Sequence, residues 1–464
     1  MSQTDRVYFL GIGGIGMSAI AFHYRLNGVD VAGYDRTPSD LTHALEAKGA
    51  TITYSDDVET IPAAFRSPEG TLVILTPAIP ADSKIWAFFR AQGHRIEKRA
   101  VALGELTRPL KTYCVAGSHG KTTTSTLMAH ILRQSHVGCS AFLGGVSVNY
   151  STNYWGNADS QFAVTEADEY DRSFLQLEPT GAVITAMDPD HLDIYGTHAK
   201  MIEAFLEFAG KVRSGGLCLV KKGLPVVGED VKSGVTVATY ALLDPLADYH
   251  AANVTVRDER YEFDIVTPRG TLKGIRLGLP GFHNIENAVA ATAMALHAGA
   301  TEDEIRSACL SFRGNKRRFE IKVERPDAMV IDDYAHHPQE IRTTLESIRS
   351  LYPGRKLTVA FQPHLYTRTR DLADDFAAAL SLADRTWLLD IYPARELPIE
   401  GVSSQMLLEK MKPGVGRMST KATLAADVTS EEFDIVAVMG AGDIDRLVAG
   451  VAEAVEKAAD KRRK

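Results

Sequence analysis

The residues with the most recognisable chemistry form a glycine loop that runs into a lysine and threonines. The loop reads Gly117-Ser118-His119-Gly120-Lys121-Thr122-Thr123, between an apolar run at 112–116 and a segment of helical character at 122–134. In a phosphate-binding loop, backbone N–H groups surround phosphate oxygens, the lysine adds positive charge and the next hydroxyl can ligate Mg²⁺. The usual pattern has an additional glycine where this chain has Val115. An ordinary strand–helix turn would also fit, but the flanking segments favour a phosphate site.

Acidic residues follow two later apolar runs of the same region. Glu166-Ala167-Asp168-Glu169 comes directly after the run at 161–165, and Asp190-His191-Leu192-Asp193 follows the run at 182–186. Acidic loops are usually solvated surface. Carboxylates at strand ends beside a phosphate loop nevertheless suit Mg²⁺, which binds protein and phosphate oxygens together. Glu166 is the best candidate ligand, while Asp168 and Glu169 can instead position other groups.

A second glycine pattern, Gly11-Ile12-Gly13-Gly14-Ile15-Gly16, follows a predicted strand at 6–10 and opens a helical stretch. With Asp35 about 20 residues further on, it is the fingerprint of a dinucleotide-binding fold and alone predicts a nicotinamide-dependent oxidoreductase. The glycines, however, provide only a tight turn close to a diphosphate, which a UDP-linked sugar also contains. The turn Thr76-Pro77-Ala78 follows another predicted strand and would meet the same ligand. Ordinary turn chemistry explains that turn equally well.

Polar side chains also gather at strand ends in the last third of the chain. Asp332-Asp333-Tyr334 and His336 follow one apolar run, and His364 with Arg368 follows the next. Histidine, tyrosine and arginine together suit a small anionic or zwitterionic substrate. His336 and His337 are adjacent and point apart on an extended or helical backbone, so they do not chelate one ion together.

Two segments between these regions have open interpretations. Asn284 and Asn287 lie where a helix is predicted to start, so they can cap that helix or hydrogen-bond an adenine edge. Arg318 lies in a basic turn at 312–319. Such a turn is either a solvated face or the source of an arginine that reaches a transferring phosphoryl group.

Alternating strands and helices must position all these residues. This alternation predicts an α/β fold with mostly parallel sheets, interrupted by a β-rich segment at 215–280. A chain of 464 residues is too long for one compact core. We predict three domains, over residues 1–107, 108–319 and 320–464.

Composition argues against several classes of protein. The chain has 45% hydrophobic and 24% charged residues, as in ordinary globular proteins, and its formal net charge of −8 argues against a nucleic-acid-binding protein. No apolar run approaches the roughly 18–20 residues of a membrane helix. Residues 1–6 include no basic region followed by a long apolar core, so we expect no secretory signal. The four cysteines are widely scattered, as expected for reduced thiols in a cytoplasmic protein.

Eight blocks, in order along nearly the whole chain, resemble the Mur ligase family. They are residues 11–18, 117–124, 166–169, 190–193, 283–287, 312–319, 332–338 and 361–370. Any one block is weak, but the eight in sequence are specific. The resemblance implies a Rossmann-like N-terminal domain for a UDP-sugar, a central P-loop ATPase-type domain and a C-terminal Rossmann-like domain for an amino acid. It therefore reassigns the first glycine turn from a nicotinamide cofactor to UDP.

The resemblance also implies a role for each candidate residue. ATP would be bound by Gly117, Ser118, His119, Gly120, Lys121, Thr122, Thr123, Asn284, Asn287, Arg318, Asp332 and Asp333. The metal ligands would be Thr122, Glu166 and His191, and the catalytic residues would be Lys121, Glu166, His191 and Arg318. The UDP-sugar would be bound by Gly11, Gly13, Gly14, Ile15, Gly16, Asp35, Thr76, Pro77 and Ala78. The amino acid would be bound by Tyr334, His336, His364 and Arg368.

The activity implied by the resemblance is ATP-driven formation of an amide bond. The γ-phosphoryl group of ATP would pass to the lactyl carboxylate of UDP-N-acetylmuramate. The amine of L-alanine would then displace phosphate from the acyl phosphate, a step in peptidoglycan precursor synthesis. ATP and Mg²⁺ would be the cofactors and small molecules the partners, with no nucleic acid or membrane, and the protein would be a monomer or weak homodimer.

Three alternatives and two departures from the family pattern accompany this interpretation. A recycling branch of the family joins a preformed tripeptide to the same UDP-sugar, and Glu166 to Asp171 would suit it. A nicotinamide-dependent oxidoreductase, which rests on residues 11–35 alone and leaves the phosphate loop unexplained, is the second alternative. A nucleotide-binding regulator without enzymatic activity is the third. Alanine-adding members of the family typically have an arginine directly after the histidine of the block at 361–370, where this chain has Leu365. The resemblance therefore leaves one contact to the carboxylate of the amino acid unassigned. Leu206 stands where sister ligases have a carbamylated lysine, so we expect no such modification.

Overall fold

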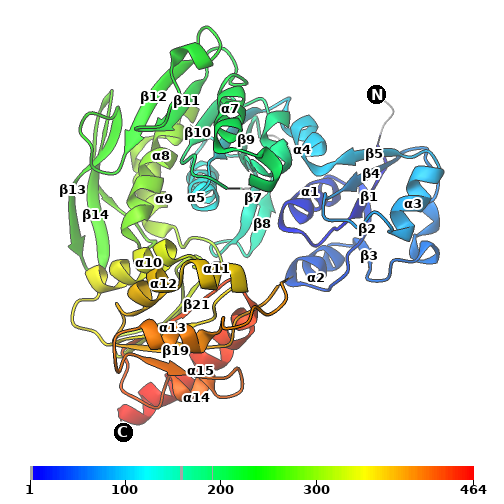
Figure 1. Ribbon diagram of the computed structural model, residues 1–464. Coiled ribbons are helices and arrows are strands. Elements are labelled where there is room, and N and C mark those ends of the chain that lie inside the picture. The colour runs from blue at the N-terminus through cyan, green and yellow to red at the C-terminus, as the bar shows by residue number, and fades with distance from the viewer. Residues whose placement is uncertain (1–3, 157–159, 191, 395, 464) are drawn as a thin grey trace. The chain divides into compact units, whose positions relative to one another are not determined.

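The computed structural model describes residues 4–156, 160–190, 192–394 and 396–463, and these residues form three sheets connected by helices (Figure 1). The predicted α/β class with three sheet-containing domains is confirmed. By its contacts the chain divides into two compact units. Unit 1 contains Met1–Asn253, Phe263–Ile275 and Glu286–Phe312, and unit 2 contains Val254–Glu262, Arg276–Ile285 and Arg313–Lys464. The domain boundaries after residues 107 and 319 remain predictions.

The first sheet has the strand order β3-β2-β1-β4-β5, with all neighbours parallel. Its strands are β1 (Arg6–Leu10), β2 (Asp30–Tyr34), β3 (Thr51–Thr53), β4 (Thr71–Leu75) and β5 (Arg95–Lys98). Its helices are α1 (Ile15–Leu26), α2 (Asp40–Ala47), α3 (Lys84–Ala91) and α4 (Arg99–Thr107), with 3₁₀ turns at Val58–Thr60 and Ala63–Phe65. The chain runs outward in opposite directions from β1 and β4. A ligand crevice is expected at the carboxyl ends of these two strands.

The second sheet has the order β15-β14-β13-β12-β11-β10-β6-β9-β7-β8. Its strands are β6 (Lys111–Ala116), β7 (Ser140–Ser147), β8 (Thr152–Trp155), β9 (Phe162–Glu166), β10 (Gly181–Ile184), β11 (Leu217–Lys221), β12 (Thr236–Ala241), β13 (Tyr249–Arg257), β14 (Arg260–Thr267) and β15 (Gly270–Arg276). Its helices are α5 (Lys121–Gln134), α6 (Leu192–Tyr195), α7 (His198–Ala209), α8 (Phe282–Ala298) and α9 (Glu302–Ser311), with 3₁₀ turns at Tyr170–Gln176 and Gly228–Asp230. β6 is buried between the parallel strands β9 and β10, so three strand ends meet beside its loop.

The third sheet has the order β16-β17-β21-β18-β19-β20, and β16 is antiparallel to β17 while the other neighbours are parallel. Its strands are β16 (Glu320–Arg325), β17 (Ala328–Asp333), β18 (Leu357–Phe361), β19 (Arg385–Leu388), β20 (Gly416–Met418) and β21 (Ile435–Met439). Its helices are α10 (Pro338–Leu351), α11 (Tyr366–Asp371), α12 (Ala373–Leu380), α13 (Ser404–Lys410), α14 (Leu424–Asp427) and α15 (Val448–Arg462), with a 3₁₀ turn at Asp443–Leu447. Continuous apolar strands such as β18 and β21 are buried on both faces, as a parallel sheet covered by helices requires.

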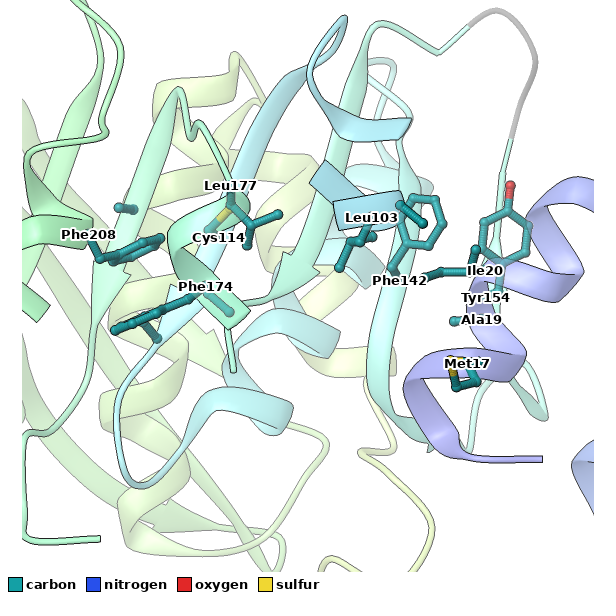
Figure 2. Close-up of a cluster of buried hydrophobic side chains, with 14 of the residues drawn as sticks. Met17, Ala19, Ile20, Leu103, Cys114, Phe142, Tyr154, Phe174, Leu177 and Phe208 are labelled. Carbon is teal, nitrogen blue, oxygen red and sulfur yellow. The ribbon is translucent and has the colours of Figure 1, made fainter. Parts of the chain in front are cut away.

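Within unit 1, helix α1 packs against β7 and β8, two strands that were not among the predicted elements. Met17 and Ile20 of α1 face Phe142 and Tyr154 in a single buried cluster (Figure 2). Each such side chain contributes roughly 1.5–3 kcal/mol when it is buried. The Asn153 side-chain amide adds a 2.6 Å hydrogen bond to the carbonyl of residue 15, at the start of α1. The first glycine turn is therefore anchored to the domain that carries the phosphate loop.

The buried cluster of unit 1 includes two of the four cysteines, Cys114 and Cys218. All four cysteines are free, buried thiols, and Cys114 belongs to the same cluster as Leu177 and the stacked pair Phe174 and Phe208 (Figure 2). Throughout the described ranges of the chain, no helix has the length and apolar character required to cross a membrane.

Candidate active site

The glycine loop after β6 adopts, at two positions, a left-handed backbone conformation that favours glycine. Gly117 has φ of 129° and Gly120, which precedes α5, has φ of 81°. A Cβ atom on Gly117 would overlap the Thr185 hydroxyl and lie 2.6 Å from the nitrogen of Ala186. The loop is thus pressed against the end of β10, and its first helical turn opens at Lys121. Unpaired N–H groups at such a helix start favour anions.

Lys121 is held inside this loop. Its ammonium group donates to the carbonyl of Gly117 at 2.6 Å and to Oε1 of Glu169 at 2.9 Å. The Glu169 side chain is 1% exposed, and its Oε2 is buried with no hydrogen-bond partner among the described residues. An ammonium group has three N–H donors, so one remains for a phosphate oxygen. Glu169, rather than Glu166, is therefore the carboxylate paired with the loop lysine.

Thr122, the residue after the lysine, contacts Glu166. The Thr122 hydroxyl donates to Oε2 of Glu166 at 2.8 Å. Burial raises the pKa of the Glu166 carboxyl, while the charge of Lys121 and the Thr122 hydrogen bond act in the opposite direction. A divalent cation would relieve that burial penalty, and hard oxygen donors are what Mg²⁺ prefers. Of the proposed metal ligands, His191 lies outside the described residues.

This oxygen pair fits Mg²⁺ bound together with phosphate better than an all-protein metal site. Among the residues that the structure describes, no group of three or more His, Cys, Asp or Glu side chains could hold a metal. Mg²⁺ at nucleotide sites takes one or two carboxylates and completes its shell with phosphate and water. Thr122 and Glu166 are sufficient for that role, which remains a prediction.

Ser118 of the phosphate loop and the two asparagines each make hydrogen bonds within the protein. Ser118 contacts the end of β10, through its N–H to the carbonyl of residue 186 at 3.2 Å and its hydroxyl to that of residue 188 at 2.8 Å. Asn287 accepts a 3.1 Å hydrogen bond from the Thr124 hydroxyl, and a Cβ on Gly120 would lie 3.0 Å from its Oδ1. Asn287 thus faces the loop. Asn284 is 3% exposed and donates to the carbonyl of Pro280 at 2.5 Å, a local contact before α8.

The two turns expected to bind a UDP-sugar are neighbours at the carboxyl ends of the central strands β1 and β4. The N–H of Thr76 donates to the carbonyl of residue 10 at 3.2 Å, and a Cβ on Gly11 would lie 2.5 Å from Cγ2 of Thr76. The N–H of Gly13 donates to Oδ2 of Asp35 at 2.8 Å, so this carboxylate holds the glycine turn. Pro77 and Ala78 lie exposed in the second turn. Gly14 precedes the helix that begins at Ile15 and Gly16.

Unit 2 brings four predicted residues together at the ends of β17 and β18. The rings of Tyr334 and His336 lie 5.1 Å apart, and those of His336 and His364 lie 6.0 Å apart. Burial lowers the pKa of both histidines, and the charge of Arg368 acts in the same direction. The Arg368 Nη1 and the His364 Nδ1 are buried without a hydrogen-bond partner in the described part of the chain. These orphaned polar atoms are what a small zwitterion would satisfy.

Arginines and carboxylates border this cluster. The guanidinium groups of Arg317 and Arg318 lie 5.1 and 5.3 Å from the Tyr334 ring centre. Burial raises the pKa of Asp332 to about 6, although Arg317 Nε is 3.6 Å away. Asp333 accepts backbone N–H groups of residues 319 and 335 at 2.9 and 2.7 Å, so its carboxylate fixes the strand end. An ATP contact for Arg318, Asp332 or Asp333 stays a prediction.

Comparison with known proteins identifies the family. The sequence matches three protein-family models. They are described as "Mur ligase family, catalytic domain" over residues 6–110, "Mur ligase middle domain" over 115–295 and "Mur ligase, glutamate ligase domain" over 317–442. The chain belongs to the Mur ligase family. The first glycine pattern is therefore not the mark of a nicotinamide-dependent oxidoreductase.

Relatives cover almost the whole of this Mur ligase. A protein of Phocaeicola vulgatus named UDP-N-acetylmuramate–L-alanine ligase is 47% identical over 97% of each chain. One of Porphyromonas gingivalis with the same name is 48% identical over 96% of this chain and 97% of its own. The crystal structure of UDP-N-acetylmuramate-alanine ligase from Thermotoga maritima superposes with a TM-score of 0.82 at 27% identity, covering 98% of this chain and 99% of its own. A murein peptide ligase of Psychrobacter arcticus, at 22% identity and a TM-score of 0.66, shares the fold.

Three contacts of this Mur ligase were not predicted from its sequence. Thr185 packs on the phosphate loop, Gly144 of β7 lies against the Glu166 carboxylate, and Arg99 contacts both Gly16 and the acidic loop. Gly144 is part of a glycine pair inside an apolar run, which is a signal for close backbone approach. Thr185 and Arg99 carry no such local signal.

Gly144 leads to a prediction about metal affinity. A Cβ at this position would overlap the Glu166 carboxylate, which is the flexible end of a side chain and can rotate away. We expect Gly144→Ala to leave the melting temperature close to that of the wild type. The Mg²⁺ concentration that gives half-maximal phosphate release should rise about 10-fold, as when the support of a metal ligand is disturbed. Gly228→Ala, with no atom near its Cβ, is the matched control. An unchanged Mg²⁺ dependence in Gly144→Ala would remove Glu166 from the metal site.

Proposed function

We propose that this Mur ligase joins L-alanine to the lactyl carboxylate of UDP-N-acetylmuramate, with ATP converted to ADP and phosphate. The observation that carries the proposal is the buried meeting of a phosphate loop, a hydroxyl and a carboxylate in unit 1. It occurs in a chain that is 47–48% identical, over nearly its full length, to relatives named for this reaction.

The residues of unit 1 suit activation of a carboxylate by ATP. Phosphoryl transfer to a carboxylate brings negatively charged oxygens together, so fixed positive charge lowers the barrier. Lys121 supplies such a charge from a site that is 14% exposed, where charge acts more strongly than in bulk water. Mg²⁺, held by Thr122 and Glu166, would neutralise phosphate charge when bound. The product of this step is an acyl phosphate.

The cluster in unit 2 suits the amino acid that attacks the acyl phosphate. Arg368 has a buried N–H group available for a carboxylate, and such a pair is a charge-assisted hydrogen bond. Because burial lowers the pKa of His336 and His364, neutral imidazoles face the same space. A neutral imidazole can accept a hydrogen bond from the amino group, which must lose a proton before it attacks. We propose Tyr334, His336, His364 and Arg368 as the alanine site.

A phosphate-release assay with a panel of acceptors tests the proposed function. ATP, Mg²⁺ and UDP-N-acetylmuramate are supplied with L-alanine, glycine, L-serine or the tripeptide L-Ala-γ-D-Glu-m-diaminopimelate, and each component is also omitted in turn. We expect phosphate only in the complete mixture, with L-alanine as the best acceptor and an amide product of matching mass. Turnover with the tripeptide but not with L-alanine would assign the chain to the recycling branch instead. ATP hydrolysis at the same rate with and without the UDP-sugar would contradict both assignments.

The partners and the compartment follow from the same chemistry. The substrates are small anionic or zwitterionic molecules, and the nucleotide pools that would supply ATP and a UDP-sugar are cytoplasmic. We therefore propose that the protein works in the cytoplasm, as a monomer or weak homodimer.

A further inference from the structure

Arg99 occupies a position between two candidate substrate sites of unit 1. It is the first residue of α4, and its side chain is 18% exposed. A Cβ on Gly16 would lie 2.9 Å from the Arg99 Nη1 and 3.4 Å from its Cζ, so the guanidinium group rests on the glycine turn proposed for the UDP-sugar. This close approach requires glycine at position 16.

The acidic loop of the ATP site holds the guanidinium group from the other side. Arg99 Nη2 donates to Oδ2 of Asp168 at 3.3 Å. Asp168 is itself fixed, because its Oδ1 accepts the N–H of Tyr170 at 3.1 Å. Across the described residues this is the one hydrogen bond that Arg99 makes, although a guanidinium has five N–H donors in a rigid fork. The N–H donors on Nη1, the guanidinium nitrogen that lies closest to the glycine turn, are therefore available there.

We infer that Arg99 binds an anionic oxygen of the UDP-sugar and that Asp168 positions it to do so. The inference rests on the proposed function, since it names a further residue of the UDP-sugar site. A planar guanidinium held at one edge by a carboxylate loses little freedom when its other edge binds an anion. A UDP-N-acetylmuramate molecule offers two anionic groups, the diphosphate and the lactyl carboxylate. Either would be an appropriate partner for the free edge of Arg99.

The neighbouring residue supplies a matched control. Lys98 pairs with Asp171 of the same acidic loop at 2.9 Å, but its side chain is 60% exposed. Both ion pairs join the first domain to this loop, so a role limited to holding the domains together would be shared by Lys98 and Arg99. A role in binding the UDP-sugar belongs to Arg99 alone.

Steady-state kinetics of four variants test the inference. We expect Arg99→Met to raise the KM for UDP-N-acetylmuramate about 10- to 100-fold, the loss expected for one charge-assisted hydrogen bond, while the KM for ATP changes less than about 2-fold. Lys98→Met should match the wild type. Asp168→Asn should raise the UDP-sugar KM a few-fold, because Arg99 is less firmly positioned. Gly16→Ala, which displaces the guanidinium group without removing it, should also raise the UDP-sugar KM and serves if Arg99→Met fails to fold.

Calorimetry with UDP and with UDP-N-acetylmuramate, on the wild type and on Arg99→Met, identifies which anionic group contacts Arg99. Weaker binding of both by Arg99→Met supports a diphosphate contact, and weaker binding of UDP-N-acetylmuramate alone supports a contact to the lactyl carboxylate. Equal behaviour of Arg99→Met and Lys98→Met, or equal increases in the KM for ATP and UDP-sugar, would overturn the inference and leave the proposed function intact. A wild-type protein that binds neither UDP nor UDP-N-acetylmuramate would overturn the proposed function together with it.

Discussion

Replacing Lys121 by alanine should lower the kcat of phosphate release about 100- to 1000-fold, the loss seen when one group that stabilises transition-state charge is removed. The reason is that Lys121 is the cation of the phosphate loop, held 2.9 Å from Glu169 and 2.6 Å from the carbonyl of Gly117. Binding of UDP-N-acetylmuramate, measured by calorimetry, should change little because the first glycine turn is untouched. Wild-type turnover by Lys121→Ala would remove the phosphate loop from the mechanism.

The same substitution should also destabilise the fold, and a double variant separates the two effects. Without Lys121 the Glu169 carboxylate, which is 1% exposed, loses its ion-pair partner. Breaking a buried ion pair on one side costs about 3–5 kcal/mol. Adding Glu169→Gln removes the isolated charge, so the double variant should regain most of the lost melting temperature while phosphate release stays low. Recovery of turnover in the double variant would show that Lys121 acts only through Glu169.

Replacing Gly117 by alanine should abolish ATP binding and reduce stability. The backbone there has φ of 129°, and the new Cβ would overlap the Thr185 hydroxyl and approach the nitrogen of Ala186 to 2.6 Å. Backbone atoms cannot rotate away as a side chain can. Adding about 1–3 kcal/mol for a strained backbone to about 1–3 kcal/mol for overpacking gives an expected loss of about 2–6 kcal/mol. Chemical denaturation and ATP titration measure the two effects.

Gly138 provides the control for this substitution. It also has a positive φ, of 65°, but no atom lies within 4 Å of a Cβ placed on it. Gly138→Ala should therefore lose only the free energy of unfolding that a left-handed backbone costs a residue with a Cβ, about 1–2 kcal/mol. Its ATP affinity should be unchanged. If the two alanine variants lose equal stability and both bind ATP, the close packing of the loop on β10 has no functional consequence.

Features that depend on neighbours in the sequence were predicted well. The strand, glycine loop and helix order around Gly117 is local, because glycine permits the positive φ values and the helix start exposes N–H groups. The acids after β9 and the polar residues after β17 and β18 were placed by the same reasoning. Carboxyl ends of parallel strands share one sheet edge, so Tyr334, His336 and His364 meet although two strands carry them.

Features that depend on packing between distant segments were not predictable from one sequence. Which carboxylate faces Lys121 depends on the path of the loop after β9, and the structure selects Glu169 while Glu166 bonds Thr122. Strand β8 lies at the edge of its sheet with β7 beside it, and both pack against α1 from another domain, so no hydrophobic periodicity in their own sequences revealed them. Gly144 contacts the Glu166 carboxylate only because β7 lies there, and Thr185 contacts the phosphate loop because it follows β10, the neighbour of β6.

The α/β class, the family and the loops in which the chemistry resides could therefore be read from the residues alone. Those properties arise from backbone preference and from the order of motifs along the chain. How the loops contact one another became visible in the folded chain, where Arg99 donates to Asp168 across 69 positions of sequence. The physical reason is that a hydrogen bond or ion pair requires a few ångströms of separation. Between remote segments, that separation is set by the packing of buried side chains such as Ile20 on Phe142 (Figure 2).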